Sequence, residues 1–371
     1  MVQLDTARAA NVKLVSGQSV TAVFVGATTG IGEYTLRGLA DTAKVNGGSG
    51  LRIYLVGRNQ VAADSILGDC RKLCPEGVFV FVKAGNLALV QDVDKACREV
   101  QRLENKRGGE GAGTAKVDML VMTQGVLQFG SRQGMSVVNS HHTTLDSQDT
   151  PETTEGLDTS MSLLYYSRMR FLTQLLPLLR ASTLATGARC ISVYAGGFEV
   201  KKQFYPDDFS LRKPEHFSFA QVRSQVTYMK TLFFENLARE NKGKLACVHI
   251  YPGLVITPSF YSKSHPWWFK MAWACVAPVA KFFATSAEDI GQRVLFLATD
   301  KYAARAGTAD TVPKDLAMSS DRVRGGGAYS VKVDGETNDV SAAYADFDRK
   351  EMVERVWDHT MEVFRDAESV K

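Results

Sequence analysis

Short apolar runs alternate with longer stretches of helical periodicity along most of the chain. The apolar runs end at Gly, Asn or other turn residues, a pattern typical of strands that are buried on both faces. The expected strands are residues 20–25, 51–56, 78–82, 118–122, 190–194, 245–251 and a short one near 328–333. The expected helices are a stretch after residue 32 that runs through 39, and residues 90–103, 157–179, 219–240, 287–298 and 349–367.

Strands that alternate with helices of this length predict a parallel, doubly wound sheet with helices on both faces. The expected fold class is therefore α/β, a Rossmann-type sheet in three α/β/α layers. The 371 residues would allow two or three domains, but α/β folds of ~250 residues often form one. We expect a single domain over 1–371. Its parts are a core at about 18–300, polar insertions at 131–151 and 302–327, a lid at 258–285 and a C-terminal helix at 349–367.

Composition narrows the class of protein. The formal net charge is only +4, too near neutral for a nucleic-acid-binding or polybasic membrane protein. Hydrophobic residues at 45% and charged residues at 23% indicate an ordinary globular chain. Six Cys without a CxxC pair do not form a disulfide framework, and the N-terminus has no apolar signal region. We expect a soluble, cytoplasmic protein with reduced thiols.

A glycine-rich turn lies between the first expected strand and the following helix. Gly26, Gly30 and Gly32 let backbone N–H groups approach a pyrophosphate at the helix N-terminus, where the helix dipole favours an anion. Thr28 and Thr29 add hydroxyl donors. With both flanking elements in place, the turn predicts a nucleotide site; the alternative is a tight turn without a ligand.

Arg58 follows the second expected strand. In a Rossmann arrangement an acid at this place binds the ribose hydroxyls of NAD(H), whereas an Arg suits the 2′-phosphate of NADP(H). We therefore expect NADP(H) as the cofactor. The alternative is a solvated surface charge.

Three motifs carry a family resemblance. Residues 25–32 read VGATTGIG, residues 117–125 end a strand in TQG, and residues 251–257 read YPGLVIT. In order and spacing they resemble the TGxxxGIG turn, the NNAG strand end and the PGxVxT element of the short-chain dehydrogenase/reductase superfamily. The resemblance covers about residues 18–300. The runs YYSRMRF at 165–171 and VYAGG at 193–197 are similar to divergent fungal members near the retinol dehydrogenase and WW-domain oxidoreductase branch.

The resemblance implies a set of cofactor contacts. The glycine turn would hold the pyrophosphate and Arg58 the 2′-phosphate. Asn86 and Leu87 would flank the adenine, with Asn86 where the family usually has Asp. Gln124 and Gly125 would lie along the adenosine ribose, and the PGxVxT residues would border the nicotinamide. The residues implied are Gly26, Thr28, Thr29, Gly30, Ile31, Gly32, Arg58, Asn86, Leu87, Gln124, Gly125, Pro252, Gly253, Val255 and Thr257.

The sequence departs from the family at the catalytic positions. The family uses Asn, Ser, Tyr and Lys, the last two spaced as YxxxK. Here Arg223 falls at the Tyr position, Thr227 at the Lys position and Ala195 at the Ser position, and the Asn position falls on Leu164 or Tyr165. A general acid or base contributes typically 10²–10⁴-fold in rate, so a redox enzyme needs a replacement.

Four side chains are the catalytic candidates. Arg223 could polarise a carbonyl or hold an acidic substrate group. Tyr194 and Tyr165 could supply a phenol, or each could pack in the core. Lys230 lies three residues after Thr227 and could reach back to the vacated position, since helical side chains lean towards the N-terminus. Tyr228 is a weaker candidate because it points about 100° away.

An aromatic segment at 265–275, with three Trp, follows the PGxVxT element. We favour a lid over a large apolar pocket, ahead of a packing element or a surface that dips into a membrane interface. No metal site is expected: Cys70 and Cys74 are interpreted as ordinary thiols, the His141–His142 pair lies in the polar insertion, and His249 is interpreted as a satisfied buried histidine.

Three functions remain open. The first is an NADP(H)-binding short-chain dehydrogenase-like enzyme that acts on a bulky apolar carbonyl or alcohol of secondary-metabolite type, with a non-standard catalytic site. The second is non-redox chemistry on the same fold: cyclisation, isomerisation or dehydration. The third is a non-catalytic NADP(H)-binding regulator. The expected partner is a small apolar substrate, with a possible homodimer; we expect neither nucleic acid nor membrane contact.

Overall fold

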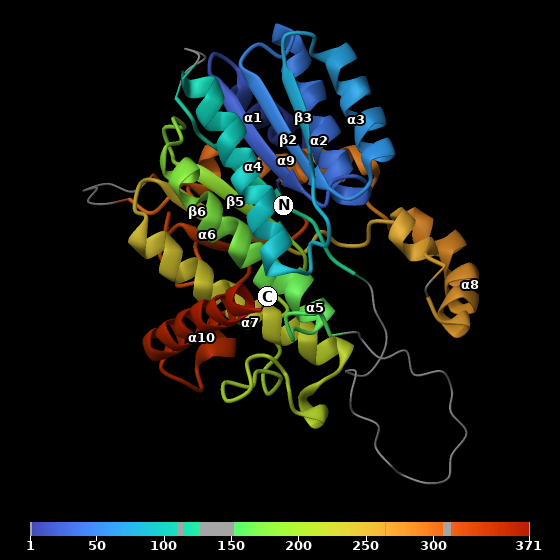
Figure 1. Ribbon diagram of the computed structural model, residues 1–371, viewed down its shortest axis with the longest axis vertical. Coiled ribbons are helices and arrows are strands. Elements are labelled where there is room, and N and C mark those ends of the chain that lie inside the picture. Colours follow the sequence, from blue (N-terminus) through green and yellow to red (C-terminus); the bar gives the residue numbers. More distant parts are fainter. Residues whose placement is uncertain (1, 110–113, 127–151, 264, 307–312, 371) are drawn as a thin grey trace.

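The computed structural model describes residues 2–109, 114–126, 152–263, 265–306 and 313–370, and these are built around a seven-stranded sheet (Figure 1). All neighbouring strands are parallel, in the order β3-β2-β1-β4-β5-β6-β7. The expected α/β class is confirmed. The strands are β1 (Val20–Val25), β2 (Leu51–Gly57), β3 (Val78–Lys83), β4 (Met119–Met122), β5 (Ala188–Val193), β6 (Leu245–Ile250) and β7 (Ala328–Val331).

Burial on both faces explains why the strands read as continuous apolar runs. Every residue of β1 is buried, and its side chains alternate between the two sides of the sheet. Ala22 and Phe24 belong to one hydrophobic core, while Val23 and Val25 belong to the other. A period-2 pattern is absent because neither face of the sheet meets water.

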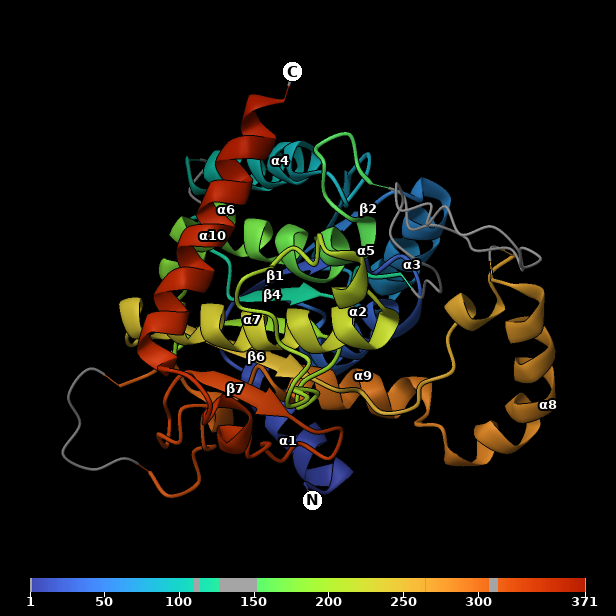
Figure 2. The same ribbon diagram turned by 90° about the horizontal axis from the view of Figure 1, so that it is seen from below.

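Helices cover the two faces in separate layers (Figures 1 and 2). One core lies under α1 (Leu4–Val15), α2 (Gly30–Ala43), α3 (Gln60–Leu73) and α9 (Ala287–Phe296). The other lies under α4 (Val90–Gly109), α6 (Ser167–Arg180), α7 (Phe219–Glu240) and α10 (Arg349–Ser369). The three layers agree with the expectation, and α7 has the bounds expected for it. Helix α1 was not expected; its Asn11 amide donates to the Gln292 carbonyl of α9 at 2.9 Å.

The helix expected at 157–179 is interrupted. It consists of α5 (Thr159–Met161), a π-helical turn η2 (Ser162–Tyr166) and α6. Such turns insert one residue into a helix and are frequent at functional sites. Here the turn shifts the side chains of Leu163 and Leu164 relative to those of α6, and both line the cavity described below.

The insertion expected at 131–151, with His141 and His142, lies outside the described residues. Of the second, 302–327, the described part packs against α7, where the Ser320 hydroxyl donates to Glu235 at 2.6 Å. The short helix η4 (Pro258–Tyr261) leads into α8 (Trp267–Phe283), which projects from the body in both views (Figures 1 and 2). Within the described ranges, no helix is both long and apolar enough to cross a membrane. The division into a single domain stays a prediction.

Candidate active site

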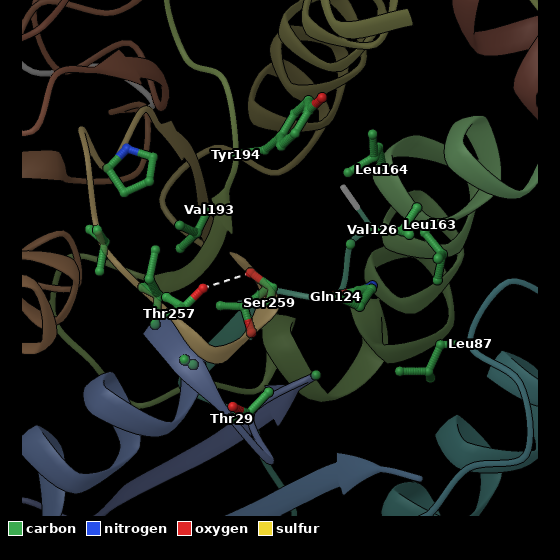
Figure 3. Close-up of a pocket in the computed structure, with 18 of the residues that line it drawn as sticks. Thr29, Leu87, Gln124, Val126, Leu163, Leu164, Val193, Tyr194, Thr257 and Ser259 are labelled. Carbon is green, nitrogen blue, oxygen red and sulfur yellow. Dashed lines mark hydrogen bonds between the residues drawn. The ribbon is translucent and has the colours of Figure 1, made fainter. Parts of the chain in front are cut away.

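The candidate site is a cavity of about 530 Å³ at the carboxyl ends of the strands (Figure 3). From β1 the chain adds β2 and β3 on one side of that strand, and then returns to add β4 on its other side. The strand order therefore reverses between β1 and β4. Open α/β sheets bind ligands at this switch point. The volume lies in the range of small-molecule sites, ~300–1,000 Å³.

All fifteen residues expected to contact the cofactor line this one cavity. They come from the five loops that follow β1, β2, β3, β4 and β6. They are Gly26, Thr28, Thr29, Gly30, Ile31, Gly32, Arg58, Asn86, Leu87, Gln124, Gly125, Pro252, Gly253, Val255 and Thr257. Their contact with a cofactor stays a prediction, but the fold brings them together as that prediction requires.

The glycine turn is built for close backbone approach. Gly26 has φ +77°, and a Cβ there would lie 2.6 Å from the backbone nitrogen of Gln124. A Cβ on Gly32 would lie 2.3 Å from the Thr123 hydroxyl oxygen and 2.8 Å from the Cα of Ala27. Side chains at these positions would therefore push the β1 and β4 loops apart. The glycines are needed for the shape of the turn.

The N-terminus of α2 faces this turn with open donors. Its N-cap, Thr29, has an extended backbone, and its side chain caps no N–H of the first turn. The first N–H groups of a helix have no partner within the helix, so they remain available to an anion. Arg58, exposed just after β2, makes no hydrogen bond or ion pair with the described residues. Both features fit the phosphates of NADP(H).

Tyr194 lies at the other end of the cavity, directly after β5 (Figure 3). Its hydroxyl is buried and has no hydrogen-bond partner among the described residues. Burial raises the pKa of Tyr194 to about 12, and the charges of Arg223 and Arg168 oppose the rise. The phenol is therefore protonated at neutral pH and has a proton to donate.

Arg168 of α6 is a buried cation beside this phenol. Its guanidinium donates to the Ser192 hydroxyl at 2.7 Å, to the Val193 carbonyl at 3.0 Å and to the Gln124 carbonyl. No carboxylate of the described residues pairs with it. Burial lowers the pKa of Arg168 to about 10, which still leaves it charged at neutral pH. It ties the ends of β4 and β5 together, and its guanidinium carbon lies 5.9 Å from the Tyr194 ring centre.

Two further cations take different places. Arg223 of α7 lines the cavity, with its guanidinium carbon 4.1 Å from the ring centre of Phe198. Lys230 does not line the cavity: it is buried behind Tyr194, its ammonium nitrogen 5.4 Å from that ring centre. Burial lowers the pKa of Lys230 well below its usual value, and Arg168 lowers it further.

Tyr165 is not part of the site. The structure buries it completely between α6, α7 and α10, where its hydroxyl forms a hydrogen bond with Thr360 at 2.8 Å. Residue 165 lies on the core side of the π-helical turn, whereas Leu164 lies on the cavity side. The sequence could not separate the two because the turn breaks the helical period. Tyr228 is also elsewhere, with its hydroxyl on the Ala343 carbonyl.

Helix α8 does not cover the cavity. Of the segment expected as a lid, only Ser259 and Phe260, before the helix, are among the lining residues. The ring centres of Phe260 and Trp273 lie 4.4 Å apart in a stacked pair. The inner side of α8 therefore packs on η4, the short helix that precedes it, and not over the cavity. The apolar lining comes instead from Leu163, Leu164, Val126 and Phe219.

Known proteins align with nearly the whole chain, although no family model matches it. The short-chain dehydrogenase/reductase SAT2 of Stachybotrys chartarum is 36% identical over 371 residues, covering 99% of this chain and 98% of its own. The oxidoreductase AN1596 of Emericella nidulans is 32% identical, covering 97% of both chains. This chain belongs to the short-chain dehydrogenase/reductase family. The branch near the retinol dehydrogenases stays a prediction.

Two solved structures share the fold at low sequence identity. The L-sorbose reductase of Gluconobacter frateurii, solved with NADPH and L-sorbose, has a TM-score of 0.51 and 19% identity, covering 81% of this chain and 97% of its own. RhlG of Pseudomonas aeruginosa, solved as an NADP active-site complex, has a TM-score of 0.50 and 18% identity, covering 79% and 94%.

The departures from the short-chain dehydrogenase pattern lie next to one another in space. The hydroxyl of Thr227, at the family's Lys position, lies 3.3 Å from the carbonyl of Ala195, at the Ser position. It also donates to the Arg223 carbonyl one turn earlier, at 2.7 Å. The aligned positions therefore do meet beside the cavity, where Arg223 is a lining residue and Ala195 and Thr227 are not, but without the side chains that the family uses.

Arg168 is the site residue that sequence reasoning missed. The sequence assigns it no role beyond its place in the run at 165–171. A signal existed: Leu164, Arg168, Leu172 and Leu175 share one helix face, so a charge lies within an apolar stripe. A charge in such a stripe predicts a buried cation that needs carbonyl or anionic partners.

Cys70 and Cys74 are ordinary buried thiols, as expected, whereas His249 agrees with the expectation only in part. His249 is buried, with Nε2 on the Thr231 hydroxyl at 3.0 Å, but its Nδ1 has no partner among the described residues, so it is not fully satisfied. Cys70 and Cys74 are both buried, and the Cys74 thiol donates to the Ala40 carbonyl.

Proposed function

We propose that the protein is an NADP(H)-dependent oxidoreductase that acts on the carbonyl or alcohol of a bulky apolar small molecule, with Tyr194 as the proton-transfer group. The observation that carries the proposal is one cavity with the glycine turn at one end and the buried, unpartnered Tyr194 phenol at the other. The solved family members named above bind NADP(H), which supports the choice of cofactor.

The residues present fit the cofactor. Gly26 to Gly32 would hold the pyrophosphate against the open N-terminus of α2, and Arg58 would take the 2′-phosphate. No Asp or Glu occurs among the described residues that line the cavity, whereas Arg58, Arg168 and Arg223 do. The charged side chains that line the cavity are therefore all positive, and they attract an anionic dinucleotide. When bound, NADPH supplies the hydride of a reduction.

The chain itself supplies the proton. In the direction of reduction, the Tyr194 side chain turns its O–H, which is buried in this structure, into the cavity and donates the proton to the substrate oxygen; the phenolate then regains one from water. Arg168 and Arg223 stabilise the negative charge on the phenolate, which is the task of the family's Lys. Arg223 also lies where it can donate to the substrate oxygen or to an acidic group beside it.

The apolar lining supports the substrate class. Leu163, Leu164, Val126, Phe219 and Phe260 line the cavity and favour a bulky hydrophobic body. Secondary-metabolite carbonyls are a class of this kind. The proposal does not depend on a particular member of it.

The experiment is NADPH oxidation by the purified protein over a panel of bulky apolar ketones and aldehydes, with product identified by mass spectrometry. Turnover that needs NADPH supports the proposal. Product formed by cofactor-stripped protein would support non-redox chemistry instead, the alternative favoured by Ala195 and Thr227 at the family's Ser and Lys positions. Tight NADPH binding without turnover across the panel would favour the regulatory alternative.

A further inference from the structure

Helix α8 is an apolar helix that stands away from the rest of the molecule (Figures 1 and 2). Its 17 residues include three Trp and three Phe but only two charged side chains, Lys270 and Lys281. A helix in this position would ordinarily be polar on its outer side. Apart from these two lysines, the large side chains of α8 that face water are apolar instead.

The helix has two apolar sides with different surroundings. Phe269, Trp273, Ala277 and Ala280 share one side at helical spacing; Trp273 stacks on Phe260, and both alanines are buried. At 100° per residue, the rest of the circumference, the outer arc, carries large exposed side chains, and Val276, 54% exposed, lies at its border with the inner side. Their exposed fractions are 66% for Trp267, 48% for Trp268, 63% for Met271, 59% for Val279, 87% for Phe282 and 78% for Phe283. Exposed apolar patches of this kind mark interaction surfaces.

Charge around the arc has a single sign. No Asp or Glu occurs between Glu240 and Glu288, whereas Lys263, Lys270 and Lys281 lie on or just before the helix. The two helix lysines fall at the border between the outer arc and the inner side, 20° apart in the helical projection. Two copies packed through this arc would bring like charges together, while an anionic surface would neutralise them.

We propose that α8 is an interfacial helix that binds the surface of an anionic lipid bilayer. The outer arc lies at the boundary of headgroups and acyl chains, where Trp and Phe are favourable, and the lysines contact headgroup phosphates. The inner side stays packed on the protein, so the helix axis lies along the membrane plane. Because Phe260 lines the cavity and stacks on Trp273 of α8, a bound α8 brings this edge of the cavity close to the lipid. The proposal rests on α8 and not on the proposed redox chemistry.

Tryptophan emission tests the proposal on the full-length chain. Three of the four Trp belong to α8, and the fourth, Trp357, stacks on Phe233 in the body. In a Trp357→Phe background, all emission comes from α8. Vesicles of equal parts phosphatidylcholine and phosphatidylserine should shift this emission to the blue. The same vesicles with brominated acyl chains should quench it, and pure phosphatidylcholine should have a much weaker effect.

Variants separate the apolar and charged contributions in vesicle flotation. Changing Trp267→Ser, Phe282→Ser and Phe283→Ser together should abolish binding. Lys270→Gln with Lys281→Gln should weaken binding to anionic vesicles about thirtyfold, about fivefold per lysine removed. Val61→Ser, equally exposed on α3, and Lys242→Gln, an exposed lysine away from α8, are the matched controls and should bind like wild type.

Two results would overturn the proposal. One is emission that no vesicle changes, which needs no variant to be interpreted. The other is a dimer of the wild-type chain in sedimentation velocity that the triple variant converts to monomer, without vesicle binding; it would assign the arc to a second copy. Unchanged thermal melting of each variant shows that the fold is intact.

Discussion

The ammonium nitrogen of Lys230 lies 5.4 Å from the ring centre of Tyr194, buried behind the phenol that lines the cavity. It forms no ion pair or hydrogen bond with the described residues. Burial of a group without a partner opposes its charged form, and the pKa of Lys230 is lowered accordingly.

Lys230→Met should stabilise the protein. The unfolded chain takes up this proton below its ordinary pKa of 10.5, while the folded chain does so only at lower pH, so the wild type loses stability as pH falls. Met fills the space without that penalty, and we expect a gain of about 1 kcal/mol or more at pH 7. Urea unfolding at pH 7 and pH 10 measures it, and the gain should shrink at pH 10. A variant less stable than wild type at pH 7 would show that the ammonium is paired.

Arg58→Ala should weaken NADPH much more than NADH. The guanidinium offers a charge-assisted contact to the 2′-phosphate, worth roughly 1.5–3 kcal/mol, so NADPH should lose tenfold or more in affinity. NADH has no phosphate at this place and should change little. Calorimetric titration of both nucleotides measures the two effects, with Arg98→Ala on the exposed side of α4 as the control. Equal weakening of both nucleotides would remove Arg58 from the site.

Gly32→Ala should disturb both the fold and the site. The added Cβ would lie 2.3 Å from the Thr123 hydroxyl oxygen, which the Val25 carbonyl holds in place. Overpacking of this kind costs about 1–3 kcal/mol, and the widened turn should lose NADPH affinity. Gly68→Ala is the control: nothing lies within 4 Å of its Cβ, and a helical Gly→Ala change should stabilise by about 0.5–1 kcal/mol. Equal stability of the two variants would contradict the tight packing of the turn.

His359 should give the protein an acid-sensitive step in stability. Burial lowers the pKa of His359 from 6.5 to about 4, and the charge of Arg212 lowers it further. Between these values the unfolded chain binds a proton that the folded chain does not, so stability falls as pH falls from 6.5 to 4. The loss should reach about 3 kcal/mol at most. His359→Gln keeps a partner for the Tyr166 hydroxyl and should lack this step. Parallel pH curves for the two proteins would contradict it.

The fold and the cofactor end of the site could be predicted because they depend on local signals. Buried strands appear in the sequence as continuous apolar runs, and the glycines of the turn lie within one short segment. The fifteen residues from five loops meet in one cavity because the carboxyl ends of parallel strands share an edge of the sheet. Sequence order and strand direction are enough for that inference.

The catalytic end could not be predicted to the same degree. The π-helical turn at Ser162–Tyr166 places Tyr165 in the core. No periodic pattern in the sequence predicts such a turn. The position of Arg168 in the site could not be predicted because the sequence indicates only a long apolar helix around it. The sequence predicts a lid at 258–285, but of that segment only Ser259 and Phe260 line the cavity, because an apolar sequence does not reveal which surface a helix packs on.

Tyr194→Phe tests the central claim most directly. It removes the one hydroxyl and leaves the ring between Arg168 and Lys230. With a carbonyl substrate found in the panel, single-turnover oxidation of bound NADPH should slow by about 10²–10⁴-fold, the range for loss of a general acid. The NADPH dissociation constant should stay the same. A variant that reduces the substrate within a fewfold of the wild-type rate would contradict the account and place the proton donor elsewhere.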